Sequence, residues 1–273
     1  MKKTVIDFFV MISLLGFISM IAPTHASMPS EEDSSPFVRL SEIIPEIIES
    51  PRYAGQENFL GRPVPGYVSH HFYCTRQAAV ALEKVNTALR QKGYTLVVYD
   101  AYRPQRAVDA FIEWTTLEND EAGKAFYYPS VPKKDLFSLG YLAKQSSHSR
   151  GSTFDVTLIS LKDSLMPIRI NQRALSNGDV IPFLDDNTLD MGSSFDLFHP
   201  ASHHDSLLIT AEQTRLRNLL RQEMHRYGFE EIKEEWWHYT LKNEPFPDTY
   251  FDLVMQDKSF GVYTHGEHDG NRQ

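Results

Sequence analysis

Apolar side chains recur every three or four residues in three parts of the chain, which is the spacing of a helix that buries one face. The first part runs from Arg76 to Lys92, and Gly93 follows it as a stop signal. The second begins after Pro104, and the third begins at a Thr-x-x-Gln capping box at Thr210 and stops at Gly228. The predicted buried stripes are Ala78, Leu82, Val85 and Leu89, then Ala107, Val108, Phe111 and Ile112, then Leu216, Leu219, Leu220 and Met224.

Short runs of β-branched and aromatic residues predict strands at Tyr94 to Tyr99 and at Phe154 to Ile159. Phe229 to Lys233 and Trp236 to Leu241 indicate a strand pair or one bent strand. There is no internal repeat, and strands and helices do not alternate regularly enough for a doubly wound sheet. We therefore expect one α+β domain with a small, mostly antiparallel central sheet flanked by helices, and a long loop from Leu161 to Asp190.

The first residues have the pattern of a secretory signal. Lys2 and Lys3 precede an uncharged run from Phe8 to Ala22, and small residues suited to cleavage end at Ala26. An uncleaved membrane anchor is the alternative, although this run is shorter than the ~20 apolar residues that a bilayer requires. We expect export, into the periplasm, with no stable membrane anchor after cleavage. The expected parts are a signal peptide at 1–26, a flexible tether at 27–37 and a folded domain at 38–273.

Composition excludes several classes of protein. Hydrophobic residues make up 41% and charged residues 23%, as in ordinary globular proteins. The 36 acidic residues exceed the 27 basic ones, so a nucleic-acid partner is not expected. The single cysteine, Cys74, can form neither an internal disulfide nor a multi-cysteine metal site, and we expect it to be buried and inert. The sequence does not indicate an oligomeric state.

Two segments combine histidine with carboxylates, a combination suited to zinc. His148 and Asp155 flank Gly151, which permits a loop entering a strand to fold back. His238 would complete two imidazoles and one carboxylate, with the fourth zinc position open for water whose proton Glu235 could accept. In a regular strand Glu235 and His238 point to opposite faces, so both reach one site only where the chain bends.

From residue types alone, other interpretations stay open. The same residues could be a solvated histidine, a helix-capping aspartate and an exposed glutamate. His199 and His203 have i,i+4 spacing, but Pro200 disfavours a helix through them and no glutamate lies between them as in His-Glu-x-x-His. Solvation better explains two further pairs, His70-His71 and His265 with His268.

Arg103 ends a predicted buried strand, where its charge requires an anionic partner. That partner could be a structural carboxylate such as Asp100 or an oxyanion that develops during a reaction. A Gly-x-Ser-x-Gly elbow and a phosphate-binding loop are absent from the sequence, so an acyl-serine hydrolase and a nucleotide enzyme are poorly supported.

Four motifs together resemble those of the VanX-type D-alanyl-D-alanine dipeptidases, which belong to the zinc D,D-peptidase group. Their order and spacing agree from about Tyr53 to Tyr250. The motifs are Tyr-Asp-Ala-Tyr-Arg-Pro at 99–104, Ser-Ser-His-Ser-Arg-Gly-Ser-Thr-Phe-Asp at 146–155, Met-Gly-Ser-Ser-Phe-Asp at 191–196 and Glu-Trp-Trp-His-Tyr at 235–239.

This resemblance implies a role for each matching residue. Glu235 would be the general base and Arg103 the stabiliser of the transition state, and Asp196 would bind the free ammonium group of a dipeptide. The ligands of one Zn²⁺ per chain, at the sheet, would be His148, Asp155 and His238. The dipeptide pocket would be formed by Tyr53, Phe111, Ser146, Asp196 and Trp236. The resemblance also implies that Glu235 and His238 both reach the metal.

The implied function is hydrolysis of D-alanyl-D-alanine by an exported zinc metallopeptidase, in peptidoglycan metabolism or cell wall turnover. One alternative is a zinc D,D-carboxypeptidase that acts on peptidoglycan stem peptides, favoured if Asp196 were ineffective. Another is a non-catalytic wall-peptide binding protein, which would need neither Glu235 nor Arg103. The long 161–190 loop leaves the substrate preference open.

Overall fold

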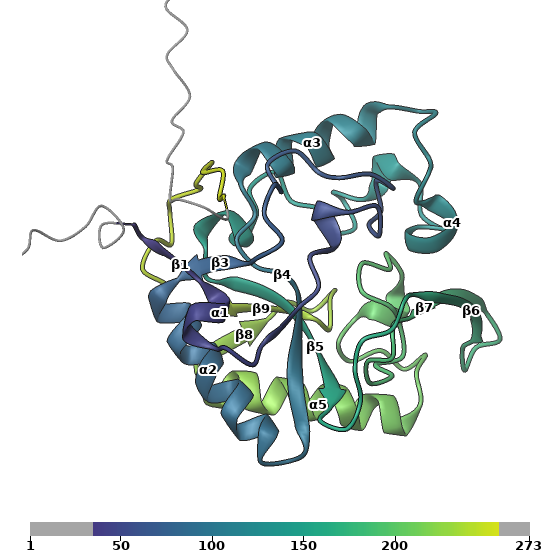
Figure 1. Cartoon of the computed structure of the whole chain (residues 1–273). Coiled ribbons are helices and arrows are strands. Elements are labelled where there is room, and N and C mark those ends of the chain that lie inside the picture. The colour runs from purple at the N-terminus through teal and green to yellow at the C-terminus, as the bar shows by residue number, and fades with distance from the viewer. Residues whose placement is uncertain (1–34, 257–273) are drawn as a thin grey trace, which may run out of the picture. The chain divides into compact units, whose positions relative to one another are not determined.

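A five-stranded sheet lies at the centre of the computed structural model, which describes residues 35–256 (Figure 1). Its strand order is β2-β4-β5-β9-β8. β2 runs parallel to β4, and all other neighbours are antiparallel. The bounds are Ile48–Glu49 for β2, Tyr94–Asp100 for β4, Thr153–Ser160 for β5, His238–Leu241 for β9 and Phe229–Glu231 for β8. The α+β class and the mostly antiparallel central sheet are confirmed.

Helices α2 (Arg76–Arg90) and α5 (Ala211–Arg226) pack against each other, with α2 against β4 and α5 against β8. Figure 1 shows them together along one side of the sheet. The predicted stripe of α2 is buried at every position, and α5 begins at the predicted capping box between Thr210 and Gln213. In α5, Leu219 is only partly buried. The continuous apolar runs of β4 and β5 are buried along nearly their whole length.

Helix α3 (Gln105–Thr116) lies away from α2 and α5 in Figure 1, with the short helices α4 (Lys124–Tyr127) and η3 (Lys133–Asp135) following it. Its buried face includes Trp114, which the predicted stripe omitted, whereas Ile112 is only half-buried. Four further short elements are α1 (Leu40–Ile43), η2 (Arg52–Ala54), η4 (Ser147–Arg150) and η5 (Pro200–Ser202).

The folded part begins slightly before the predicted boundary. Phe37, which we assigned to the tether, is the first residue of β1 (Phe37–Arg39), and β1 pairs with β3 (Tyr73–Thr75). The Phe37 ring is buried because it packs against Tyr102 and Phe251. The predicted signal peptide at 1–26 and residues 27–34 of the tether lie outside the described residues.

The prediction of a long loop from Leu161 to Asp190 is wrong, because this segment contains a β-hairpin. Its strands are β6 (Arg169–Ala174) and β7 (Val180–Asp185), and Gly178 in the turn has φ 91°. Strand β6 is mostly exposed, so it lacks the alternation of apolar and polar residues that a half-buried strand shows. Its sequence pattern was therefore that of a loop.

Two further expectations concern residues within the described range. Cys74 is fully buried, as predicted, and burial raises the pKa of its thiol. Between residues 35 and 256, no helix combines the length and the apolar character needed to cross a bilayer.

Candidate active site

Three neighbouring strands carry a row of ionisable side chains. The β5–β9 register pairs Asp155 with His238, and the β4–β5 register pairs Asp155 with Asp100 just after an irregularity in β4. His148 comes from η4, the short turn that leads into β5. Gly151 ends this turn with φ 82°, and a Cβ atom there would lie 2.2 Å from the Phe37 ring. Only glycine therefore allows the turn to bring His148 back over the sheet.

Three donor atoms form an equilateral triangle. His148 Nε2, His238 Nδ1 and Asp155 Oδ1 are each 3.2 Å from the other two. Tetrahedral zinc with ligands at about 2.0–2.1 Å requires ligand atoms about 3.3–3.4 Å apart, so the triangle fits this ion. Asp155 Oδ1 is buried and has no hydrogen-bond partner among the described residues, as expected of a metal ligand.

Hydrogen bonds orient both imidazoles toward this triangle. His148 Nδ1 lies 2.7 Å from the Ala101 carbonyl oxygen and must donate to it, which leaves a lone pair on Nε2. On His238 the Nε2 atom lies 3.1 Å from Ser147 Oγ, which leaves Nδ1 for the triangle. Sequence reasoning missed Ser147, although it lies in the same motif as His148.

Glu235 reaches the triangle because the chain turns before β9 begins. Trp236 and Trp237 form this turn, and the His238 amide donates to the Glu235 carbonyl at 3.3 Å. Glu235 Oε2 therefore lies 3.6 Å from His238 Nδ1. The alternation of a regular strand does not apply to Glu235, because this residue precedes the strand.

The surroundings shift the pKa values of Glu235 and Asp155 in opposite directions. Burial, reinforced by the Asp155 and Asp196 charges, raises the pKa of Glu235 well above its usual value. Burial alone would also raise the pKa of Asp155, but His148 and then His238 hold it below its usual value. Asp155 is therefore suited to remain ionised as a ligand, whereas Glu235 is suited to exchange a proton.

Arg103 is held by a structural carboxylate and also faces the site. Its Nε donates to Asp100 Oδ2 at 3.0 Å, and Tyr67 donates to the other oxygen of Asp100 at 2.7 Å. Arg103 Nη2 lies 3.7 Å from Asp155 Oδ2, and the guanidinium lies 5.0 Å from the centre of the Tyr53 ring. Arg103 also lines the cavity described next, so its guanidinium lies where negative charge that develops in a reaction could meet it.

The triangle opens into a cavity of about 270 Å³. Its wall includes Tyr53, Phe111, Ser146 and Asp196 from the predicted pocket, together with Glu235 and Arg103. Asp196 has φ 58°, a left-handed conformation that is uncommon outside glycine, and its Oδ2 accepts a 2.7 Å hydrogen bond from Tyr53. Burial, followed by the nearby Asp155 charge, raises the pKa of Asp196 well above its usual value.

Two predicted pocket residues have identifiable structural contacts. Ser146 caps the turn that carries His148, accepting from the His148 amide at 3.3 Å. The structure does not place Trp236 on the cavity wall: it is buried, and its Nε1 donates to Ser193 Oγ at 2.9 Å.

The rival histidines have other partners. His199 Nδ1 accepts from the Ala201 amide and caps η5, and His203 Nε2 lies 3.3 Å from the Tyr141 hydroxyl. His71 Nδ1 lies 2.8 Å from a Glu49 oxygen. His265 and His268 lie outside the described residues. Within the described part of the chain, the triangle is the one group of three such side chains positioned to hold a metal ion.

The family profile and the curated relatives that match this sequence are all described as D-alanyl-D-alanine dipeptidases. Residues 33–168 and 182–256 match the profile of a family described as D-ala-D-ala dipeptidase. A D-alanyl-D-alanine dipeptidase of Enterococcus faecium is 36% identical over 220 residues, which is 81% of this chain and 98% of that protein. Those of Streptomyces coelicolor and Escherichia coli are 37% and 30% identical, over 80% and 77% of this chain and 98% and 86% of theirs. Residues 169–181, from β6 into the start of β7, fall between the two matched ranges.

A solved vancomycin-resistance D,D-pentapeptidase in complex with Zn(II) is also similar, at 13% identity and a TM-score of 0.29, over 67% of this chain and 84% of that one.

Proposed function

Since the chain belongs to the D-Ala-D-Ala dipeptidase family, we propose that it is a peptidase that uses one Zn²⁺ per chain to hydrolyse the free dipeptide D-alanyl-D-alanine. The observation that carries this proposal is the arrangement of one cavity. The triangle of His148, Asp155 and His238 lies in the same cavity wall as Asp196, a buried carboxylate suited to an ammonium group. The proposed metal site and the carboxylate proposed to bind the free amine thus line one cavity.

The three ligands would hold a zinc ion that acidifies water and polarises the scissile carbonyl. Glu235 accepts the proton of the attacking water and delivers it to the leaving amine, a role for which its raised pKa is suited. Arg103, which lines the same cavity, directs its guanidinium at the negative charge that develops on the carbonyl oxygen. Asp100 keeps Arg103 in that orientation through the 3.0 Å bond to Nε.

Recognition of a free dipeptide depends on the other end of the cavity. Asp196 is buried with a raised pKa, so it gains most from a cationic partner that restores its ionised form. Tyr53 holds this carboxylate through its hydroxyl. A substrate whose amine is acylated, as in a longer peptide, would bring a neutral amide to a buried carboxylate and lose that interaction.

The direct experiment is release of D-alanine from D-alanyl-D-alanine by the purified chain, with and without a chelator. An N-acetylated dipeptide and a stem pentapeptide provide the comparison. Chelator-sensitive cleavage of the free dipeptide alone is the expected result. Cleavage of the blocked or longer peptide would instead indicate a D,D-carboxypeptidase, and cleavage of none would favour the wall-peptide binding protein.

We further propose that the enzyme is exported and acts on dipeptide released during cell wall turnover. The support is the sequence pattern of residues 1–26, with its two lysines, apolar run and cleavage position near Ala26. Expression of the full chain followed by fractionation and N-terminal sequencing tests this. A mature protein that begins near Ser27 in the exported fraction is expected, and an intact N-terminus in the cytosol would contradict it.

A further inference from the structure

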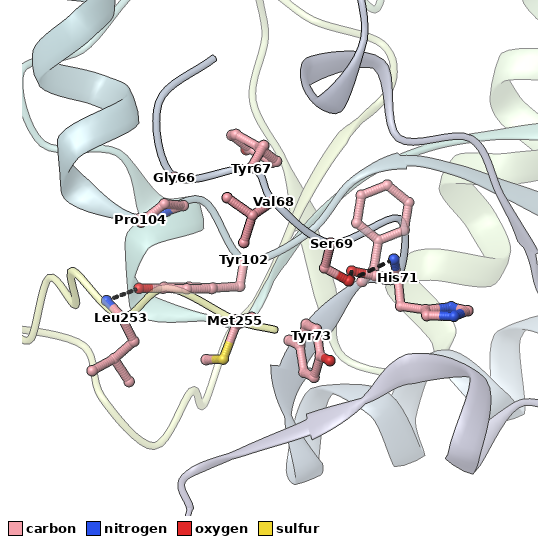
Figure 2. A pocket seen from close by; sticks show the side chains of 11 residues that line it. Gly66, Tyr67, Val68, Ser69, His71, Tyr73, Tyr102, Pro104, Leu253 and Met255 are labelled. Carbon is pink, nitrogen blue, oxygen red and sulfur yellow. Dashed lines mark hydrogen bonds between the residues drawn. The ribbon is translucent and has the colours of Figure 1, made fainter. Parts of the chain in front are cut away.

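The end of the described chain crosses the outside of the active-site loops. We call residues Tyr250–Gln256 the C-terminal strap. Figure 2 shows Leu253 and Met255 of the strap beside Tyr102 and Tyr73, at a narrow pocket whose other wall includes Gly66 to Ser69. The Leu253 amide donates to the Tyr102 hydroxyl at 2.7 Å, the dashed line on the left of the figure.

One strap residue connects the two segments that supply the site. The Phe251 amide donates to the carbonyl of Ser149, the residue after the ligand His148, at 2.8 Å. The Phe251 carbonyl accepts from the amide of Gln105 at 2.9 Å, two residues after Arg103. Gln105 is the first residue of α3, whose amide has no partner within the helix, so the strap satisfies an otherwise unpaired donor.

Side chains fix the strap at the same two places. The guanidinium and amide of Arg106 form three hydrogen bonds to the Asp252 carboxylate, at 2.8 to 2.9 Å. On the other side, Arg150 lies over the Tyr250 ring at 5.6 Å. The Phe251 ring packs against Phe37 at a centroid distance of 5.1 Å.

We propose that the C-terminal strap is a positioning element that sets the spacing between Arg103 and the His148 turn. This inference rests on the proposed dipeptidase function for the role of Arg103. Arg103 and His148 already meet inside the site, where the Arg103 amide donates to the His148 carbonyl at 3.3 Å. The strap adds a second connection on the outside, so the two segments cannot separate without breaking contacts at both places.

The Arg103 end of the strap can be tested with a matched pair of variants in the full chain. Gln105→Pro removes the amide that donates to Phe251, at a helix position where proline is well tolerated. Pro104 already has φ −63° and ψ 148°, which suits a residue before proline. Gln105→Ala is the control, because it keeps the amide and removes the same side-chain contacts to Asp109 and Lys144.

We expect Gln105→Pro to have a kcat on D-alanyl-D-alanine about ten-fold below that of Gln105→Ala, because small misplacements of a catalytic group are costly, with KM within about two-fold. In an Arg103→Ala background the same pair should differ little, since both changes remove one interaction. A purely structural strap would give equal kcat values for the pair, or an equal loss in both backgrounds.

The His148 end is tested without using activity. Phe251→Pro and Phe251→Ala both lose the ring, but only the proline variant loses the amide that donates to Ser149. Loaded with zinc, Phe251→Pro should release the ion to a chelator about ten-fold faster, because the turn that carries the ligand His148 loses a contact that fixes it. Equal release rates would overturn this half of the proposal.

The two readouts separate the possible failures. If the unaltered chain did not cleave D-alanyl-D-alanine, the proposed function would fail while zinc release would still test the strap. If Phe251→Pro did not fold, the Gln105 pair would still test whether the strap positions Arg103. Equal kcat within the Gln105 pair together with equal zinc release within the Phe251 pair would reject the strap as a positioning element.

Discussion

At the scale of single residues, the site depends on two carboxylates with opposite tasks. Two imidazoles keep Asp155 ionised, whereas burial and neighbouring negative charge raise the pKa of Glu235 and so make it the stronger base. Their side chains lie near the same histidine, His238.

Replacing Glu235 with glutamine should separate chemistry from metal binding. We expect kcat to fall by about 10²- to 10⁴-fold, the usual contribution of a positioned general base. Zinc content, measured by atomic emission on the dialysed protein, should stay near that of the unaltered chain because the three ligands remain. Near-normal turnover by Glu235→Gln would exclude it as the base.

Replacing Asp196 with asparagine should change the choice of substrate. Loss of a buried charge pair with the ammonium group costs about 2–5 kcal/mol, or roughly 30- to 4,000-fold in kcat/KM for the free dipeptide. Zinc content should not change, because Asp196 is not one of the three proposed ligands. Tyr53→Phe is a milder companion, since it removes one hydrogen bond and keeps the carboxylate. An unchanged kcat/KM of Asp196→Asn for the free dipeptide would contradict the assignment.

At the scale of elements, sequence periodicity predicted the helices that bury one face. The stripe of α2 and the capping box of α5 are examples, because burial imposes the spacing directly. The hairpin β6–β7 was missed because ion pairs at both of its ends help to hold it. Arg52 with Asp186 and Arg173 with Asp190 make these contacts, and polar pairs leave no periodic signal.

Only part of the site could be predicted, because motifs identify residues but not the strand register that places them. The family motifs indicated His148, Asp155 and His238, and the structure brings all three together. The pairing of Asp100 opposite Asp155 depends on strand register and on an irregularity in β4, neither of which can be read from one sequence. Trp236 does not line the cavity because it lies in a turn two residues long, and such a turn leaves no periodic signal in the sequence.

The base of the hairpin gives a stability prediction. Arg52 and Asp186 are both buried, and Tyr99 also donates to Asp186 at 2.6 Å. Arg52→Met should lower the free energy of unfolding by about 3–5 kcal/mol, because it leaves an unpaired buried charge. The double variant Arg52→Met with Asp186→Asn should recover part of this loss. Urea titration measures both, and a loss below about 1 kcal/mol for Arg52→Met would contradict the argument.

At the scale of the whole molecule, one buried histidine makes stability depend on pH. His204 is buried, its ring nitrogens have no partner among residues 35–256, and burial, with the nearby Arg221 and Arg217, lowers its pKa to about 4. In the unfolded chain its pKa returns to about 6.5. Protons therefore bind the unfolded state first as the pH falls, and the stability present above pH 6.5 is lost between about 6.5 and 4.

Comparing the unaltered chain with His204→Phe isolates the contribution of His204 to the pH dependence of stability. Unfolding free energies at pH 7.5 and pH 4.5 should show a loss for the unaltered chain that exceeds the loss for the variant by about 2–3 kcal/mol. The comparison removes contributions from other groups, since they titrate in both proteins. Equal pH dependence of the two proteins would show that His204 is not the source.

The triangle of donors with equal 3.2 Å sides also bears on competition among metals. Two imidazoles and a carboxylate suit several divalent ions, and nitrogen and oxygen sites generally bind Cu²⁺ more tightly than Zn²⁺. Hydrogen bonds to Ala101 and Ser147 fix the directions of the donors, but they do not distinguish these ions. The spacing of the triangle favours a tetrahedral ion, and the supply of metals where the protein folds would decide among the ions that accept this geometry.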